Sequence, residues 1–465
     1  MSEAVTRHTT TSTGTGTFGS TGLLASLDPL LREWLPRQRW FAGKGRPVTG
    51  FGLLSSTELL PATAPVGLLH LLVRAHQPGQ PGDCYQLLIG VRRALPPHLA
   101  PALIGHVQDG PLAGRTVYEA LYDTRAADLL LEALRVRARI GELRFDSDPG
   151  QNIRTDLVPR RMTAEQSNSS LVYGDTFILK LLRRIVPGTN PDLELPLALA
   201  HEGCPRVPAP VAWMTTEVTE VSEETYVLGV LQPYLQGAMD GWELALRELA
   251  KGEDFTAEAR ALGRATGEVH TALARALPTV TLGRQQLDPL VDGMMERLDA
   301  AVQAVPALHP HAPGLRTAYE ALADLAAEGH HWTAQRIHGD LHLGQCLRSA
   351  SGDWSIIDFE GEPSRPLAER RLPHPAVRDV AGMLRSFDYA AHAHEPYAPD
   401  WAEACRAAYC TGYADATGRD PRTEPVLLRA YETDKAVYEV VYEARHRPDW
   451  LPVPLSAVHR LADPS

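Results

Sequence analysis

The 465-residue sequence has few cysteines and no long apolar run. Its five cysteines, Cys84, Cys204, Cys346, Cys405 and Cys410, form no CxxC pair, which disfavours a disulfide framework and a structural zinc site. No segment approaches the roughly 20 consecutive apolar residues that span a bilayer, and the start lacks the basic and apolar regions of a signal peptide. These absences predict a cytoplasmic protein with no membrane partner.

The sequence also lacks an excess of positive charge. Lys and Arg number 45 against 57 Asp and Glu, a formal net charge of -12, which argues against nucleic acid as a partner. Small polar substrates and metal cations remain possible binding partners. With 44% hydrophobic and 22% charged residues the composition is that of an ordinary globular protein, long enough for two or three packed units.

Patterning along the chain predicts an α+β protein with two lobes. Residues 8–21 are almost all Thr, Ser and Gly and predict a disordered tail over 1–22. A mixed portion over 23–118 and a strand-rich portion over 119–232 follow, and 233–465 has mostly helical periodicity. Within the second portion, SLVYGDTFILKLLRR predicts a hairpin that turns at Gly174 and Asp175 and carries Lys180 on an apolar strand face.

The stretch RIHGDLHLGQCL, residues 336–347, carries the clearest chemistry. Asp340 is followed five positions later by Gln345, and the strand-like run WSIID ends in Asp358. Phosphoryl transfer needs a carboxylate that orients the acceptor hydroxyl and oxygen ligands for the Mg²⁺ of the nucleotide. HGDLHLGQ and DFE resemble the HRDxxxxN and DFG pattern of protein kinases. We therefore predict Asp340 as the catalytic base and Gln345 and Asp358 as metal ligands, at the ends of adjacent strands.

A kinase also needs a strand-borne lysine for the ATP phosphates, and Lys180 fits that role. Its carboxylate partner is predicted in NPDLEL, with Glu194 and Asp192 both open. No GxGxxG loop precedes the hairpin, so the phosphates are expected on small polar residues of EQSNSS, namely Gln166, Ser167, Asn168 and Ser169. LQPYLQG at 231–237 is a candidate adenine hinge.

Zinc hydrolysis is an alternative to phosphoryl transfer. His338 and His342 are four residues apart, but Gly339 intervenes and no HExxH glutamate is present. HPH at 309–311 and HAH at 392–394 lack convincing further ligands. Hydrogen bonds that brace the loop are the favoured role of His338 and His342.

Taken together, IHGDLHLGQ, IIDFEGEP with SRPLAERRLP, and RDVAGMLRSFDYAA resemble the actinobacterial maltokinases, which belong to the aminoglycoside-phosphotransferase-like kinases. The likeness extends to WLPRQRWFAGK, to EQSNSSLVYGDTFILKLLRR with GTNPDLEL, and to DKAVYEVVYEARHRPDWLPVPL, and it covers nearly the whole chain after about residue 23. It implies a bilobal eukaryotic-protein-kinase-like fold with an N-terminal cap subdomain over 23–118.

The resemblance further implies that ATP and Mg²⁺ convert maltose to maltose 1-phosphate, which feeds α-glucan synthesis from maltose supplied by a trehalose synthase. Carried over by motif, Asp340 matches the catalytic aspartate, Gln345 and Asp358 match the metal ligands, and Lys180 matches the phosphate-binding lysine. A glutamine among the metal ligands is a feature of the family. His446 departs from it, since asparagine is more usual there.

The segment DKAVYEVVYEARHRPDW predicts the sugar site. An apolar helical stripe from Ala436 to Ala444 leaves Lys435, Tyr438 and Glu439 on other faces. Carboxylates accept hydrogen bonds from vicinal hydroxyls and aromatic rings stack on sugar faces, whereas the alternative is a solvated face with a Lys435–Glu439 pair. The expected sugar contacts are His338, Lys435, Tyr438, Glu439 and Trp450.

Two rival functions stay open besides the hydrolase. One is a related kinase that acts on another sugar such as glucosamine, for which extra acidic residues near the acceptor are expected. The other is a catalytically silent kinase-like binding module, which the joint presence of Lys180, Asp340, Gln345 and Asp358 disfavours.

Overall fold

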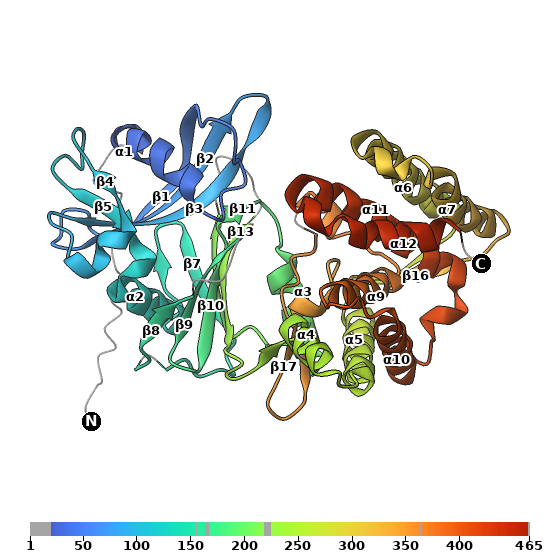
Figure 1. Ribbon diagram of the computed structural model, residues 1–465. Coiled ribbons are helices and arrows are strands. Elements are labelled where there is room, and N and C mark those ends of the chain that lie inside the picture. Colours follow the sequence, from blue (N-terminus) through green and yellow to red (C-terminus); the bar gives the residue numbers. More distant parts are fainter. Residues whose placement is uncertain (1–19, 155, 163–166, 218–224, 363–364, 464–465) are drawn as a thin grey trace, which may run out of the picture. The chain divides into compact units, whose positions relative to one another are not determined.

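The computed structural model describes residues 20–154, 156–162, 167–217, 225–362 and 365–463. The chain forms two compact units, the first from residues 1–190 and 210–234 and the second from 191–209 and 235–465 (Figure 1). The predicted boundary between residues 232 and 233 lies close to residue 235, where the last segment of the second unit begins. Residues 191–209 also belong to the second unit, although the predicted boundaries assign them to the portion over 119–232. The separation of 23–118 from 119–232 stays a prediction.

The first unit contains two antiparallel sheets. One has the strand order β1-β2-β3-β5-β4 with β11 paired to β3, and its strands are β1 (Gly50–Leu60), β2 (Gly67–Gln77), β3 (Gln80–Arg92), β4 (Leu103–His106), β5 (Thr116–Glu119) and β11 (Arg184–Ile185). Helix α1 (Ser20–Trp34) packs on this sheet, because its leucines Leu23, Leu27 and Leu31 share one face and lie buried against the strands.

The second sheet has the order β6-β7-β12-β13-β10-β9-β8. Its strands are β6 (Arg139–Ile140), β7 (Leu143–Ser147), β8 (Pro159–Arg161), β9 (Ser169–Tyr173), β10 (Phe177–Leu181), β12 (Ala212–Glu217) and β13 (Thr225–Pro233), and helix α2 (Thr124–Arg135) accompanies them. The predicted hairpin is confirmed as β9–β10, with Gly174 in the left-handed conformation at φ 55°. Lys180 lies on central β10 between Ser170 of β9 and Val230 of β13.

The second unit is mostly helical. Its helices are α3 (Pro191–His201), α4 (Gly241–Lys251), α5 (Thr256–Ala276), α6 (Arg284–Ala304), α7 (Ala312–Ala327), α8 (Leu367–Arg370), α9 (Val377–His392), α10 (Pro399–Thr417), α11 (Pro425–His446) and α12 (Pro452–Ala462). Its short strands are β14 (Met239–Asp240), β15 (Val280–Leu282), β16 (Trp332–Ala334), β17 (Cys346–Arg348) and β18 (Trp354–Ile356). The mixture of helices and sheets confirms the α+β prediction.

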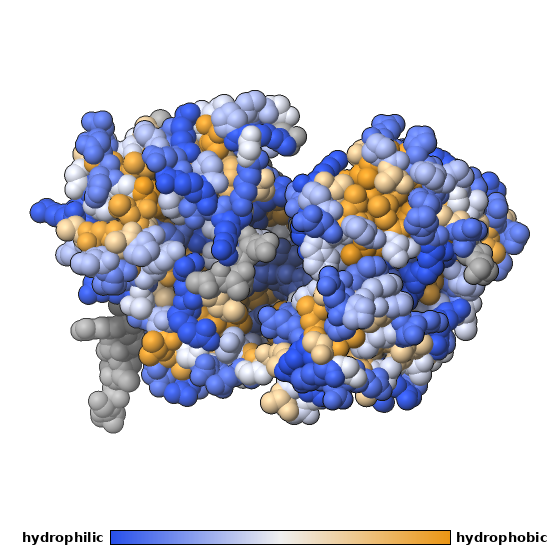
Figure 2. Space-filling model, in the orientation of Figure 1, coloured by the Kyte–Doolittle hydropathy of each residue, from blue (hydrophilic) through white to orange (hydrophobic). Residues whose placement is uncertain are grey.

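Short 3₁₀ helices connect these elements. They are η1 (Leu35–Arg37), η2 (Pro97–Ala102), η3 (Ala120–Tyr122), η4 (Pro306–Leu308), η5 (Leu343–Gln345), η6 (Pro421–Thr423) and η7 (Pro448–Trp450). Among the described helices none is long and apolar enough to span a bilayer. On the faces drawn in Figure 2, polar side chains prevail and apolar ones gather in separate small patches.

Two apolar cores support the helical unit. One surrounds α5, α9 and α10 and includes Leu262, Phe387 and Tyr409, and the other surrounds α6, α7, α11 and α12 and includes Leu298 and Val440. Helices α9 and α11 therefore each have one side fixed by a packed core. The polar side chains on their remaining sides acquire defined positions, and several of them form the site described next.

Candidate functional site

The loop that carries Asp340 is held by a buried aspartate on α9. Asp379 is 1% exposed, and its carboxylate accepts hydrogen bonds from the backbone N–H of His338 and of Gly339, both at 2.8 Å. His270 on α5 lies 3.0 Å from the same carboxylate. Hydrogen bonds to a charged acceptor are among the strong ones, so Asp379 fixes the backbone immediately before Asp340.

His338 braces this loop from within. Its Nε2 lies 2.9 Å from the carbonyl oxygen of Ile357, and its Nδ1 accepts from the N–H of Asp340 at 3.3 Å. The side chain is 2% exposed, and among the described residues it lines no cavity beside Asp340. The geometry agrees with the bracing role, and a direct contact of His338 with a sugar stays a prediction.

Asp340 forms an ion pair with Lys435 of α11. Nζ of Lys435 lies 3.0 Å from Oδ1 of Asp340, and the two side chains are 23% and 21% exposed. Burial acts to raise the pKa of Asp340, but the charges of Lys435 and His342 outweigh it and hold that pKa at about 2. Burial likewise opposes the Lys435 ammonium, yet the neighbouring Asp340 and Glu439 raise its pKa above the ordinary value. The pair is therefore ionised at neutral pH.

The loop also depends on a glycine of α9. A Cβ at Gly382 would lie 2.7 Å from the carbonyl oxygen of Leu341, a backbone atom next to Asp340. Because backbone cannot yield as a flexible side chain does, any larger residue would displace the loop.

Gly382→Ala should accordingly lower kcat by about 10²-fold, since small misplacements of reacting groups have effects of this size. It should also lower the free energy of unfolding by about 1–3 kcal/mol. The matched control is Gly293→Ala on α6, where the nearest atom is the mobile end of Arg297 and stability should hold or rise by up to about 1 kcal/mol. Wild-type kcat in purified Gly382→Ala would contradict the close-packing argument.

The predicted metal ligands lie side by side. Gln345 precedes β17, which pairs with β18 in the register Cys346↔Ile356, so Gln345 and Asp358 meet at the same end, and Nε2 of Gln345 donates to Oδ2 of Asp358 at 3.0 Å. The expectation that Asp340 also ends an adjacent strand is wrong. β16, which precedes the loop, pairs with β15 instead, and the Asp379 hydrogen bonds position Asp340.

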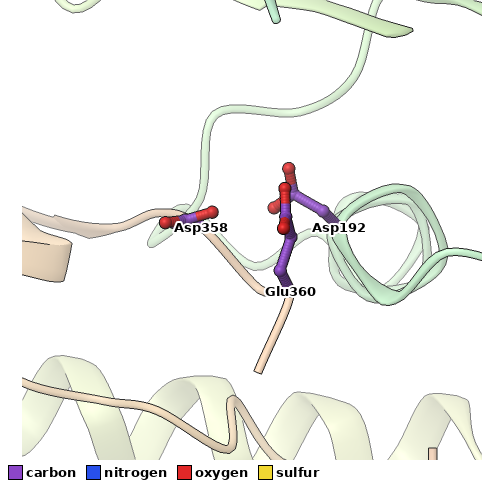
Figure 3. Close-up of side chains that lie close together, drawn as sticks. All are labelled: Asp192, Asp358 and Glu360. Carbon is purple, nitrogen blue, oxygen red and sulfur yellow. The ribbon is translucent and has the colours of Figure 1, made fainter. Parts of the chain in front are cut away.

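Two further carboxylates join Asp358. Asp192 from the start of α3 and Glu360 lie with it so that one oxygen of each is within 4.8 Å of the others (Figure 3). The backbone N–H of Phe359 donates to Asp192 at 2.7 Å, and Asp358 adopts φ 66°, a conformation that side-chain-bearing residues rarely adopt. Clustered carboxylate oxygens are the donors that Mg²⁺ or Ca²⁺ prefers, so these residues fit a hard divalent cation.

The residues expected to bind the nucleotide phosphates belong to the first unit, whereas Glu194 belongs to the second. The buried Arg183, which is 2% exposed, contacts two of the expected phosphate-binding residues. Its backbone N–H donates to Oδ1 of Asn168 at 3.3 Å, and its Nε donates to Oγ of Ser169, the first residue of β9, at 2.8 Å. Nδ2 of Asn168 lies 3.5 Å from Oγ of Ser167. Gln166 lies outside the described residues.

The partner of Lys180 stays a prediction, because Lys180 and its two candidate carboxylates belong to different units. Within the helical unit, Glu194 forms an ion pair with Arg336 at 2.7 Å. Asp192 instead lies with Asp358, as described above.

A cavity of about 1010 Å³ opens beside Asp340 and Lys435 in the helical unit. Its aromatic lining consists of Trp242, Tyr389, Tyr438, Tyr442 and Trp450. The rings of Tyr389 and Trp450 stack with centroids 6.2 Å apart at 13°. The predicted contacts Lys435, Tyr438, Glu439 and Trp450 all line it, as does His446. Aromatic faces next to hydrogen-bonding groups suit a saccharide.

Two of the acidic residues that line this cavity, Glu439 and Glu443, are paired with arginines. Glu439 accepts from Arg385 at 2.8 and 2.9 Å, and Glu443 accepts from Arg447 at 2.6 and 2.9 Å and from the hydroxyl of Tyr389 at 3.2 Å. Acidic side chains are present as the sequence suggested, and cationic partners balance three of them, Asp340, Glu439 and Glu443. Asp240 and Glu243 line the same cavity.

Comparison with known proteins places this chain in a family. The model of the maltokinase N-terminal cap domain matches residues 34–123. A glucosamine kinase of Streptacidiphilus jiangxiensis is 31% identical over 324 residues, 63% of this chain and 71% of that protein. A glucosamine kinase of Mycolicibacterium smegmatis is 30% identical over 344 residues, 65% of this chain and 79% of that protein. The chain belongs to the maltokinase and glucosamine kinase family.

This maltokinase-family chain is therefore a sugar kinase, and its fold agrees with that conclusion. A solved glucosamine kinase in complex with glucosamine, ADP and inorganic phosphate has a TM-score of 0.68 and 24% identity, covering 95% of this chain and 99% of that one. The expected bilobal kinase-like fold with an N-terminal cap is confirmed.

Sequence reasoning about this family member missed several site residues. Glu360 is the last residue of DFE, where protein kinases have glycine, and the sequence predicts Asp192 only as a possible partner of Lys180. Arg385 and Tyr389, on α9, lie far in sequence from the residues they contact, and no local pattern marks them.

Proposed function

We propose that this kinase transfers the γ-phosphoryl group of ATP, with Mg²⁺, to the anomeric hydroxyl of maltose and so forms maltose 1-phosphate. The observation that carries the proposal is the Asp340–Lys435 pair at the edge of an aromatic-walled cavity of about 1010 Å³. A place in α-glucan synthesis, with maltose supplied by a trehalose synthase, belongs to the same proposal.

In this mechanism Asp340 orients the attacking hydroxyl and accepts its proton. Its carboxylate is ionised and the Asp379-anchored backbone holds it in place, so no rearrangement of the loop is needed before proton transfer. Lys435 keeps Asp340 ionised and places a positive charge beside the attacking hydroxyl.

We assign Gln345, Asp358, Asp192 and Glu360 to the metal. When bound, Mg²⁺ offsets the negative charge of the nucleotide phosphates. Lys180, Ser167, Asn168 and Ser169 are proposed to hold those phosphates, with Gln166 and the hinge 231–237 completing the nucleotide site.

Two features favour a neutral disaccharide over glucosamine. The cavity is at the upper end of the roughly 300–1,000 Å³ typical of small-molecule sites and is roomy for one sugar ring. The Lys435 ammonium beside Asp340 would repel the ammonium of glucosamine, while Glu439 and Glu443 are already paired with arginines. Glucosamine remains the second candidate because two relatives of 30% and 31% identity are glucosamine kinases.

ADP release with ATP and Mg²⁺ should be measured across maltose, glucose, glucosamine, trehalose and buffer alone, with Asp340→Asn as the control. We expect a rate with maltose at least ten times that with any other sugar, absent in the variant. ³¹P NMR should then place the phosphate on the anomeric oxygen. A preference for glucosamine would move the acceptor assignment, and no activity on any sugar would favour the silent binding module.

A further inference from the structure

Glu439, a wall residue of the sugar cavity, is held by a buried arginine behind it. Arg385 of α9 is 1% exposed, and both its Nε and its Nη2 donate to one oxygen, Oε2 of Glu439, at 2.9 and 2.8 Å. Glu439 itself is 8% exposed. Neither bond reaches Oε1, so the second carboxylate oxygen keeps its capacity to accept from a ligand hydroxyl.

Arg385 is in turn fixed on its far side. Its Nη1 donates to Asp388 at 2.7 Å, and Asp388 also accepts from Arg460 at 2.9 Å and from Arg406 at 3.4 Å. Arg406 pairs with Glu432 at 2.7 Å. Charges of opposite sign alternate along this series of ion pairs, which spans α9, α10, α11 and α12. Arg385 therefore cannot rotate away from Glu439 without also breaking its ion pair with the half-buried Asp388.

Arg385 supports a second wall residue as well. Its guanidinium carbon lies 5.6 Å from the ring centroid of Tyr389, whose ring stacks on Trp450. Among the residues described around the sugar cavity, Arg385 is not part of the lining, so it would act on a sugar only through Glu439 and Tyr389.

Burial favours the neutral form of a carboxyl group. It raises the pKa of Glu439, and the adjacent charges of Arg385 and Lys435 oppose that rise. An ionised carboxylate accepts hydrogen bonds more strongly than a neutral acid and cannot compete as a donor. The arginine thus favours the form of Glu439 that binds hydroxyls.

We propose that Arg385 is a positioning residue for acceptor-sugar recognition: it fixes one oxygen of Glu439 so that the other accepts hydrogen bonds from the hydroxyls of a neutral sugar. This inference rests on the proposed sugar site. It assigns Arg385 no contact with the sugar and no part in phosphoryl transfer.

A double-mutant cycle tests the inference, with Arg385→Lys, Glu439→Gln and the double variant. Lysine keeps the charge but loses the two-donor geometry, so Arg385→Lys should raise KM for the accepted sugar about tenfold and leave kcat and KM for ATP within twofold. Glu439→Gln should raise KM for the sugar by a similar or larger factor. The double variant should match Glu439→Gln alone, because Arg385 acts through that carboxylate.

Arg406→Lys is the matched control. Arg406 contacts the same Asp388 and is 16% exposed at its side chain, but it pairs with Glu432 instead of Glu439. The same chemical change there should leave KM for the sugar within twofold, whatever its effect on the unfolding temperature.

Several results would overturn the positioning role. These are multiplicative KM effects in the double variant, an equal fall in kcat for every substrate, or a tenfold rise in sugar KM in Arg406→Lys. Failure of the proposed function is distinguishable, because it is measured as ADP release by the wild-type protein. If the wild type phosphorylates another sugar and not maltose, the double-mutant cycle is measured with that sugar. A wild type inactive on every sugar would overturn both.

Discussion

An Asp340→Asn variant should bind ATP normally and transfer its phosphoryl group with kcat lowered by about 10²–10⁴-fold. Asparagine keeps the shape of the side chain but cannot accept the proton of the attacking hydroxyl. The hydrogen bonds from His338 and Gly339 to Asp379 do not involve the Asp340 side chain, so the loop backbone should stay in place. ADP release gives kcat, and calorimetric titration with ATP gives Kd.

Asp415→Asn is a suitable control. Asp415 pairs with Arg260 at 2.8 Å on the surface of the same unit and is 36% exposed, so its loss should change neither kcat nor ATP affinity measurably. A kcat within tenfold of wild type in Asp340→Asn would remove Asp340 from the base position. Loss of ATP binding would instead show that the variant disturbs the fold.

The features that sequence predicted are those fixed by neighbours along the chain. Gly174 and the alternation around Lys180 specify the β9–β10 hairpin locally, and the structure contains it. The apolar spacing around Val437 and Val440 likewise specifies which side of α11 meets the core. In both cases the periodicity of the strand or helix determines on which face each side chain lies. The face of α11 that carries Lys435 therefore follows from the spacing of residues in the sequence alone.

Long-range contacts set the rest of the site. The adjacent-strand expectation for Asp340 is wrong because β16 pairs with β15, whose paired residues lie 50 to 54 positions earlier (Leu282↔Trp332 and Val280↔Ala334). The loop is positioned by Asp379 on a later helix. The Arg385–Glu439 pair joins residues 54 positions apart. Such pairings depend on how helices pack, which the spacing of residues within one helix does not determine.

The acidic residues illustrate the difference between composition and environment. From sequence, Glu439 and Glu443 are compatible with an amino-sugar pocket, because carboxylates attract ammonium groups. In the structure both lie against arginines and a lysine occupies the side of Asp340. The number of acidic residues in the sequence therefore does not give the charge that these carboxylates present to a ligand, because that charge depends on their cationic partners.

Asp358→Asn should abolish both turnover and magnesium-induced stabilisation. The carboxylates of Asp192, Asp358 and Glu360 lie within 4.8 Å of one another, and Asp358 is the member that also contacts Gln345. Replacing its carboxylate with an amide removes one of the three negative charges of the cluster, so the affinity for a hard divalent cation should fall steeply. Because Mg²⁺ organises the nucleotide phosphates in kinases, turnover should fall with it.

Thermal unfolding with and without Mg²⁺ gives a readout that does not depend on activity. A ligand present at about ten times its Kd stabilises the folded state by about 1.4 kcal/mol, which raises the unfolding temperature of the wild type by a measurable amount. Asp358→Asn should show no such rise up to tenfold higher Mg²⁺. The matched control, Asp353→Asn, changes a 70%-exposed aspartate between β17 and β18 and should respond like the wild type. Magnesium stabilisation that survives in Asp358→Asn would contradict this assignment, because the cation would then be held without the Asp358 carboxylate.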